Sequence, residues 1–198
     1  MQPKVLSNNQ SNEHYEIEPI EDILRDMADF NLKDIVSDMK KIGFDVTALR
    51  SKQEKGINKI YVTEKGVSTE IMQHELSAGF FRTLAFVIYI RYLLINKKVR
   101  TLLIDDICEG IDYTRSVQLA KFLLNISKEY KSIQFIITSN DSYLMDVIPL
   151  DCWNVLVRNK DVVQVKNTQN NPKLFKRFEK LGLNNFDFFS SDFIDKND

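Results

Sequence analysis

The chain has little of what several common protein chemistries require. Its 198 residues contain two cysteines and two histidines, too few for a disulfide framework or a His/Cys metal site. Its six glycines nowhere form the GxxxxGK[ST] spacing that cradles nucleotide phosphates. The net charge of −1 gives no global attraction to nucleic acid. These absences exclude a disulfide scaffold, a zinc domain and a phosphate-loop enzyme complete within this chain.

Long hydrophobic runs are also scarce. The segment 1–12 is polar and rich in Asn and Gln, unlike a secretory signal. The stretch 80–95 is apolar, but it carries Arg82 and Arg91 and falls short of the roughly 20 residues of a membrane span. We therefore expect a buried core helix there, no membrane partner and a cytoplasmic location.

Three regions follow one another along the chain. Residues 1–18 are polar and predict a disordered tail. In residues 19–73, apolar side chains first recur every three or four positions and then form short runs around Gly56 and Gly66. This pattern predicts helices followed by a small antiparallel insert. In residues 74–198, helices alternate with strands that are apolar on both faces, which predicts an α/β lobe with a mostly parallel sheet.

The end of this lobe has its own pattern. The segments 153–158 and 162–166 flank Asn159-Lys160-Asp161, a sequence typical of a hairpin turn. A short helix is expected from Pro172. Four phenylalanines then lie between residues 183 and 194, and we favour a core position for them over a partner surface.

Three short motifs stand at the ends of predicted elements. Residues 76–82 (LSAGFFR) open a helix expected over 79–97, and residues 135–141 (FIITSND) close a strand expected over 133–138. Residues 102–106 (LLIDD) close a strand expected over 100–105 and lead into Glu109-Gly110-Ile111-Asp112. Ligands of open α/β sheets bind at the carboxyl ends of strands, so the acidic pair is a candidate site. Taken alone, the pair is better explained as a strand end that caps the next turn.

Together the motifs resemble the C-terminal half of an ABC-type ATPase domain, as found in SMC-like, RecF-like and OLD-like members of the AAA family. The resemblance covers residues 70–190 and implies a partial three-layer α/β fold that binds ATP and Mg²⁺. The motifs would be, in order, the signature, Walker B, the D-loop and the switch. The Walker A phosphate loop has no counterpart here, so the resemblance implies ATP hydrolysis only if another segment or chain supplies it.

The resemblance also assigns chemistry to single residues. Asp105 would hold Mg²⁺ while the metal bridges nucleotide phosphates. Asp106 takes the place of the catalytic base, usually Glu, and Asn140 that of the switch residue, usually His. Asp is one methylene shorter than Glu, and Asn cannot become cationic, so we expect slow hydrolysis.

A second group of residues would act across a head-to-tail dimer. The resemblance implies that this group reaches the nucleotide held by the partner: Ser77, Ala78, Gly79, Arg82 and Asp112. A helix N-terminus suits phosphate, and glycine permits close backbone approach. Structural alternatives stay open: Ser77 and Asp112 as helix caps, and a structural ion pair for Arg82, which we favour. Asn140 likewise lies in a sequence suited to capping a helix.

Three hypotheses about function follow. The first is an ATPase lobe that supplies signature, Walker B and switch residues at a dimer interface. It would serve DNA repair or anti-phage defence, with a nuclease or another effector and DNA as candidate partners. The second is a non-catalytic module, derived from such an ATPase, that dimerises or docks a partner. The third is a truncated form of a longer ATPase.

Overall fold

The computed structural model describes residues 23, 32–97 and 100–190. The predicted tail over 1–18 and most of the first predicted helix lie outside these residues. The chain divides into two compact units, Met1–Ser139 and Asn140–Asp198, and each is described by itself.

The first unit begins with helix α2 (Leu32–Ile42) and a small antiparallel sheet. The helix buries Ile35, Met39 and Ile42, the face that their spacing predicts. It ends at Gly43, whose φ of +102° is a left-handed conformation open to glycine. Strands β1 (Val46–Glu54), β2 (Ile57–Glu64) and β3 (Ile71–Met72) then pair antiparallel in chain order, which confirms the predicted insert.

Helix α3 (Ala78–Ile95) is the central helix of the first unit. Among the described residues it alone is long and apolar enough to span a membrane, yet 67% of it is buried within the structure. Its Arg91 donates from Nε to Oδ2 of Asp38 on α2 at 2.5 Å, and Asp38 is fully buried. Lys41 binds the other oxygen of Asp38 at 2.9 Å. The burial and the ion pairs fit the predicted core helix.

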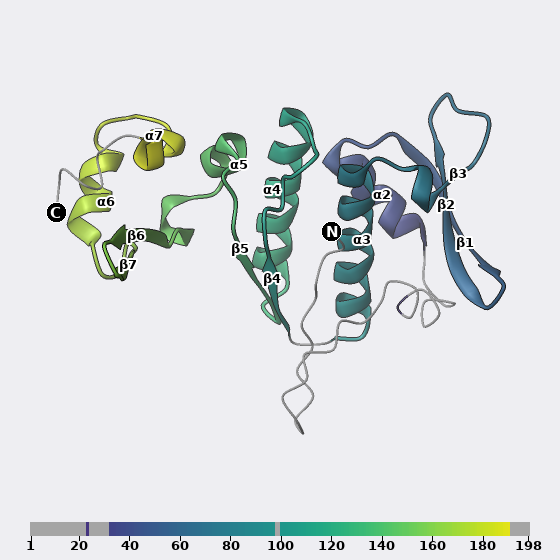
Figure 1. Ribbon diagram of the computed structural model, residues 1–198, viewed down its shortest axis with the longest axis horizontal. Coiled ribbons are helices and arrows are strands. Elements are labelled where there is room, and N and C mark those ends of the chain that lie inside the picture. The colour runs from purple at the N-terminus through teal and green to yellow at the C-terminus, as the bar shows by residue number, and fades with distance from the viewer. Residues whose placement is uncertain (1–22, 24–31, 98–99, 191–198) are drawn as a thin grey trace, which may run out of the picture. The chain divides into compact units, whose positions relative to one another are not determined.

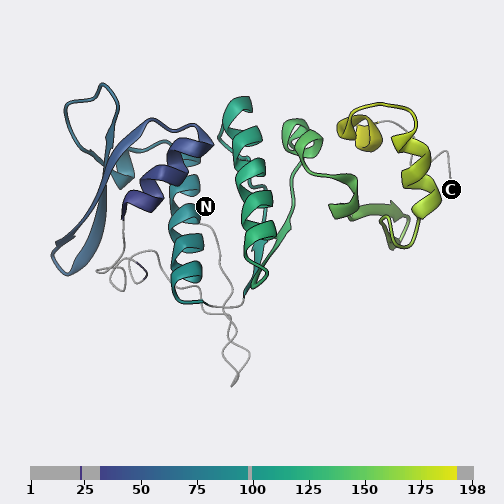
Figure 2. The ribbon, with the colours of Figure 1, turned by 180° about the vertical axis from the view of Figure 1, so that it is seen from behind.

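Strands β4 (Arg100–Ile104) and β5 (Ile133–Ile137) pair in parallel, joined through helix α4 (Tyr113–Glu129). In both views α4 runs alongside the two strands (Figures 1 and 2). Leu102 and Ile133 are buried on the inner face, where the ring of Phe135 lies 6.1 Å from that of Phe86 on α3. The crossover connection and the parallel pairing confirm the predicted α/β class.

The outer face of this strand pair is uncovered within the described residues. Leu103 and Ile136, which are partners in the register, expose 47% and 51% of their surface. Thr101 and Gln134 pair beside them and are also exposed. Parallel strands are normally covered on both faces. The exposed face, and the outer edges of β4 and β5 that pair with no other described strand, therefore indicate that further elements could complete this sheet.

The second unit has its own small core. It contains α5 (Ser142–Val147), the predicted hairpin β6 (Val155–Asn159) and β7 (Val162–Lys166), α6 (Pro172–Glu179) and α7 (Asn185–Ser190). The rings of Phe175 and Phe178 lie 4.8 and 4.7 Å from that of the fully buried Phe188. This contact confirms the core position expected for Phe188.

Candidate functional site

The acidic pair lies where β4 ends, at the start of a turn over residues 105–110, here called the acidic turn. Asp105 is exposed and Asp106 is half-buried. Asp106 has a φ of +51°, a left-handed conformation that is uncommon for a residue other than glycine. The backbone therefore leaves the extended strand conformation in a bend at this pair.

Thr138, just after β5, links this turn to the neighbouring strand. Its hydroxyl donates to Oδ1 of Asp105 and accepts from the backbone N–H of Asp106 at 3.1 Å. Its own N–H donates to the Ile104 carbonyl at 2.9 Å, so parallel pairing brings it to this place. Thr138 was not among the predicted site residues, although it lies within the motif over 135–141.

Arg82 of α3 holds the acidic turn from the other side. One terminal nitrogen donates to the backbone carbonyls of Asp105, at 3.0 Å, and Asp106, at 3.2 Å. The other forms an ion pair with Glu109. The structural ion pair that we favoured for Arg82 is thus present, and the two carbonyl contacts come in addition.

Gly79 brings the start of α3 against the acidic turn. A Cβ atom placed on Gly79 would lie 2.1 Å from the carbonyl oxygen of Gly110 and 2.9 Å from the Ile111 side chain. Gly110 itself has a φ of +81°. Packing within the chain is therefore sufficient to require glycine at position 79. Ser77 and Ala78, just before it, are exposed, and the Ser77 hydroxyl caps α3 by accepting from the Phe80 N–H at 3.3 Å.

Asp112 caps helix α4. Its carboxylate accepts from the Arg115 N–H at 3.1 Å and binds the Arg115 guanidinium at 2.5 Å. The backbone hydrogen bond from Arg115 is the main cause that lowers the pKa of the Asp112 carboxyl. Arg115 also stacks over the Phe44 ring, 4.5 Å from its centre. The cap alternative for Asp112 is realised, and its action across a dimer stays a prediction.

Asn140 opens the second unit and is exposed. The next residue, Asp141, caps α5 by accepting from the N–H groups of Tyr143 and Leu144 at 2.9 and 2.8 Å. The capping chemistry expected of this segment is therefore carried by Asp141. The switch role of Asn140 stays a prediction.

Among the carboxylates of the acidic turn, Asp105 fits Mg²⁺ best. Among the described residues, no group of three or more His, Cys, Asp or Glu side chains is placed to hold a metal ion, so these residues build no all-protein metal cage. Asp105 alone offers an exposed carboxylate at the strand end, with Oδ1 bound to Thr138. Mg²⁺ is commonly held by one or two carboxylates together with phosphates and water, and Asp105 fits that pattern.

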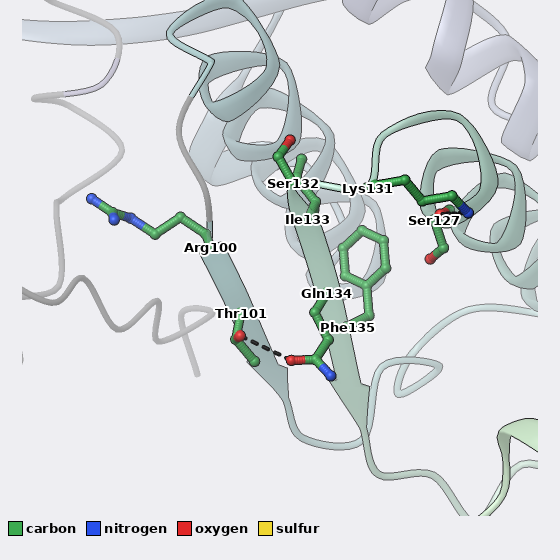
Figure 3. A pocket seen from close by; sticks show the side chains of 8 residues that line it. All are labelled: Arg100, Thr101, Ser127, Lys131, Ser132, Ile133, Gln134 and Phe135. Carbon is green, nitrogen blue, oxygen red and sulfur yellow. Dashed lines mark hydrogen bonds between the residues drawn. The ribbon is translucent and has the colours of Figure 1, made fainter.

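A shallow pocket lies at the opposite ends of the same strands (Figure 3). It is lined in part by Arg100 and Thr101 at the start of β4 and by Ile133 and Gln134 at the start of β5. The Arg100 and Lys131 side chains extend to different sides rather than converging. No carboxylate is among the described residues that line the pocket, so we assign it no part in the candidate site.

Comparison with known proteins gives a fold. No protein-family model and no curated protein matches the chain. One matching chain comes from a study of ATP-driven dimerisation and DNA-stimulated activation of SMC ATPases. It is 16% identical, with a TM-score of 0.58, and the match covers 79% of this chain and 97% of that one. An Smc head bound to the C-winged-helix domain of ScpA is 15% identical, with a TM-score of 0.59 and coverage of 78% and 50%.

A third match is an Smc head domain from Pyrococcus furiosus with an extended coiled coil, bound to the C-terminal domain of ScpA. It is 15% identical, with a TM-score of 0.56, and the match covers 75% of this chain and 37% of that one. The chain thus spans half or less of the length of these two Smc chains. Similarity at this level of identity concerns the fold alone: the chain has the α/β fold of SMC ATPase heads, an ABC-type ATPase-like fold.

Proposed function

We propose that the chain is the C-terminal lobe of an ABC-type ATPase and supplies signature, Walker B and switch residues for Mg-ATP binding and hydrolysis at a dimer interface. One observation carries the proposal. Arg82, Gly79 and Thr138 join the start of α3 and the end of β5 to the acidic turn. Two of the three motifs singled out in the sequence therefore meet the third at one edge of the sheet.

In this proposal each side chain has a distinct task. Mg²⁺, when bound, would supply positive charge that offsets the negative charge of the ATP phosphates. Asp105 would hold the metal through water, and Asp106 would orient the attacking water. Ser77 and Ala78 are exposed at the start of an 18-residue helix, where backbone N–H groups suit the phosphate held by a partner. As the switch residue, Asn140 would donate a hydrogen bond to the bound nucleotide.

The Walker A loop would come from another segment or chain. The outer face around Leu103 and Ile136 is exposed, and β5 pairs only with β4 among the described residues. A parallel strand leading into a phosphate loop would extend this sheet, and its flanking helix would cover the outer face. The nucleotide would then lie between two such heads, in a homodimer or heterodimer.

The biological setting is proposed from resemblance. ATP-dependent dimerisation would control an effector such as a nuclease, or a grip on DNA, in DNA repair or anti-phage defence. The study containing one structural neighbour concerns SMC ATPases that dimerise on ATP and are stimulated by DNA, which supports a dimeric ATPase as the first system to test.

A second candidate is a non-catalytic module that keeps the fold to dimerise or to dock a partner. The observation that favours it is the pair of substitutions at the expected base and switch positions, Asp106 and Asn140. Such a module should keep partner binding and function after Asp105→Ala, whereas an ATPase lobe should lose nucleotide-dependent activity.

The test is calorimetric titration of Mg-ATP into the chain alone and into its complex with a Walker A-bearing polypeptide, sought first in the segment encoded directly upstream. We expect binding only in the complex, and a loss of roughly tenfold or more in Mg-ATP affinity with Asp105→Ala. Asp161→Ala, in the exposed β6–β7 turn, is the matched control. Equal binding by the Asp105→Ala complex, or none by the wild-type complex, would refute the ATPase proposal.

A further inference from the structure

We propose that Arg82 is a positioning residue that sets the direction of the Asp106 carboxylate, the group proposed to orient the attacking water. Arg82 would thereby couple the start of α3 to this carboxylate within the same chain. This inference rests on the proposed function. It concerns a task within the chain, distinct from the contact with a partner's nucleotide that the resemblance suggested for Arg82.

The acidic turn needs external support. A left-handed backbone at a non-glycine residue such as Asp106 persists only where its surroundings hold it. Here Thr138 accepts from the Asp106 N–H at 3.1 Å, and Arg82 donates to the Asp106 carbonyl at 3.2 Å. The two groups that flank the Asp106 Cα are thus tied to different elements, which fixes where its side chain leaves the backbone.

The guanidinium suits this task better than an ammonium. One nitrogen of Arg82 bridges two successive carbonyls while the other reaches Glu109, which uses the planar fork of arginine. Only 20% of the Arg82 side chain is exposed, against 66% of Glu109. The contact to the Asp106 carbonyl is part-buried, whereas the ion pair and the Asp105 contact are exposed. Solvent therefore screens the Asp106 contact least, and this contact is the one that holds the turn at Asp106.

The same helix carries both the exposed signature residues and this support. Arg82 follows Gly79 by three residues, which is about one helical turn, and Gly79 packs against Gly110 at the far end of the acidic turn. The start of α3 therefore contacts the turn at two points. A displacement of Ser77 and Ala78 by a partner's phosphate would be passed to the Asp106 backbone through Arg82.

The first readout uses the full chain without nucleotide. Arg82→Lys should speed amide hydrogen exchange at least about tenfold at Asp106 and at Glu109, whose N–H donates to the Asp106 carbonyl at 3.1 Å. Exchange at Thr138, bonded to Ile104, should stay unchanged. Arg91→Lys is the control, since Arg91 lies on the same helix but faces Asp38. A change of less than twofold, or an equal response to Arg91→Lys, would overturn the proposal.

The second readout is steady-state hydrolysis by the complex with the Walker A-bearing polypeptide. Arg82→Lys should lower kcat at least about tenfold and leave the KM for Mg-ATP within about twofold, because misplacement of a reacting group by about 1 Å can cost on the order of 100-fold. In an Asp106→Asn background, Arg82→Lys should cause no further loss.

The outcomes separate the two proposals. If Arg82→Lys raises KM and leaves kcat unchanged, Arg82 is a ligand of the partner's nucleotide. If Arg82→Lys lowers kcat in the Asp106→Asn background as much as in the wild type, Arg82 does not act through Asp106. Either result overturns the positioning role. Absence of hydrolysis in the wild-type complex would instead refute the proposed function, while the exchange experiment would still decide whether Arg82 holds the turn.

Discussion

Helix α3 carries one arginine near each end, and the two face different kinds of partner. Arg82 donates to two backbone carbonyls of the acidic turn, whereas Arg91 binds the fully buried carboxylate of Asp38. Contacts to carbonyls select a backbone conformation, and contacts to a buried charge mainly compensate its desolvation. The comparison teaches that two arginines on one apolar helix can have different tasks: Arg82 supports the backbone of the candidate site, and Arg91 stabilises the core.

The largest effect is expected at the Arg91 end. Asp38→Ala should lower the free energy of unfolding by about 3 kcal/mol, because it leaves the Arg91 charge largely buried without its carboxylate. Urea unfolding followed by circular dichroism measures the loss. The double variant Asp38→Leu/Arg91→Met is the control and should recover most of it, since well-packed apolar pairs can replace buried ion pairs. If Asp38→Ala lowers the free energy of unfolding by less than about 1 kcal/mol, the Asp38–Arg91 pair does not stabilise the core as this comparison requires.

A smaller effect is expected at the Arg82 end. Gly79→Ala would improve helix propensity by up to about 1 kcal/mol if the site were open. The Cβ would lie 2.1 Å from the Gly110 carbonyl, so we expect destabilisation of about 2 kcal/mol instead. The sign measured by urea unfolding decides between these alternatives. The exposed neighbour Ala78, replaced by glycine, is the control and should cost no more than about 1 kcal/mol.

The smallest effect on stability is expected at Asp112, which caps helix α4. Asp112→Ala should cost about 1 kcal/mol. The folded-state pKa of Asp112 is lowered from 3.8, chiefly by the Arg115 N–H. Its carboxylate therefore contributes full stability above that ordinary pKa and loses it as the pH falls through the folded value. A carboxyl NMR titration with a midpoint at or above 3.8 would contradict this. Asp112→Asn is the control, because it keeps a cap acceptor without titrating.

The sequence predicted those features that depend on neighbouring residues. Ser77 and Asp112 precede helices and cap them. The strand leading to Asp105 is a short apolar run that begins at Arg100 as expected and ends at Ile104, one residue before the expected end.

The buried face of α4 was less well predicted. The residue spacing after Asp112 predicts an inner face made of Val117, Ala120, Leu123, Leu124 and Ser127. Of these, Val117, Leu124 and Ser127 are only half-buried. The buried face is instead shifted toward Ser116, Leu119, Ala120, Leu123 and Ile126, and an apolar pattern does not single out the fully buried Ser116.

The geometry of the acidic turn could not be predicted from local pattern. The contact from Arg82 to Asp105 spans 23 residues of sequence, and that from Asp106 to Thr138 spans 32. These distant groups hydrogen-bond to Asp106 in its left-handed conformation. That position holds no glycine that would have predicted a left-handed turn residue. The sequence suggests that Gly79 allows close backbone approach to phosphate, whereas the structure gives Gly79 a close neighbour, Gly110, within its own chain.

The contact between Gly79 and Gly110 also limits which sequences this fold can accept. The atom that blocks a larger residue at position 79 is the main-chain oxygen of Gly110, which every amino acid possesses. No substitution at position 110 removes it, and the φ of +81° there disfavours side chains as well. A suppressor of Gly79→Ala should therefore be an insertion or deletion that changes the backbone path of the acidic turn. Point mutations at position 110 should not suppress Gly79→Ala.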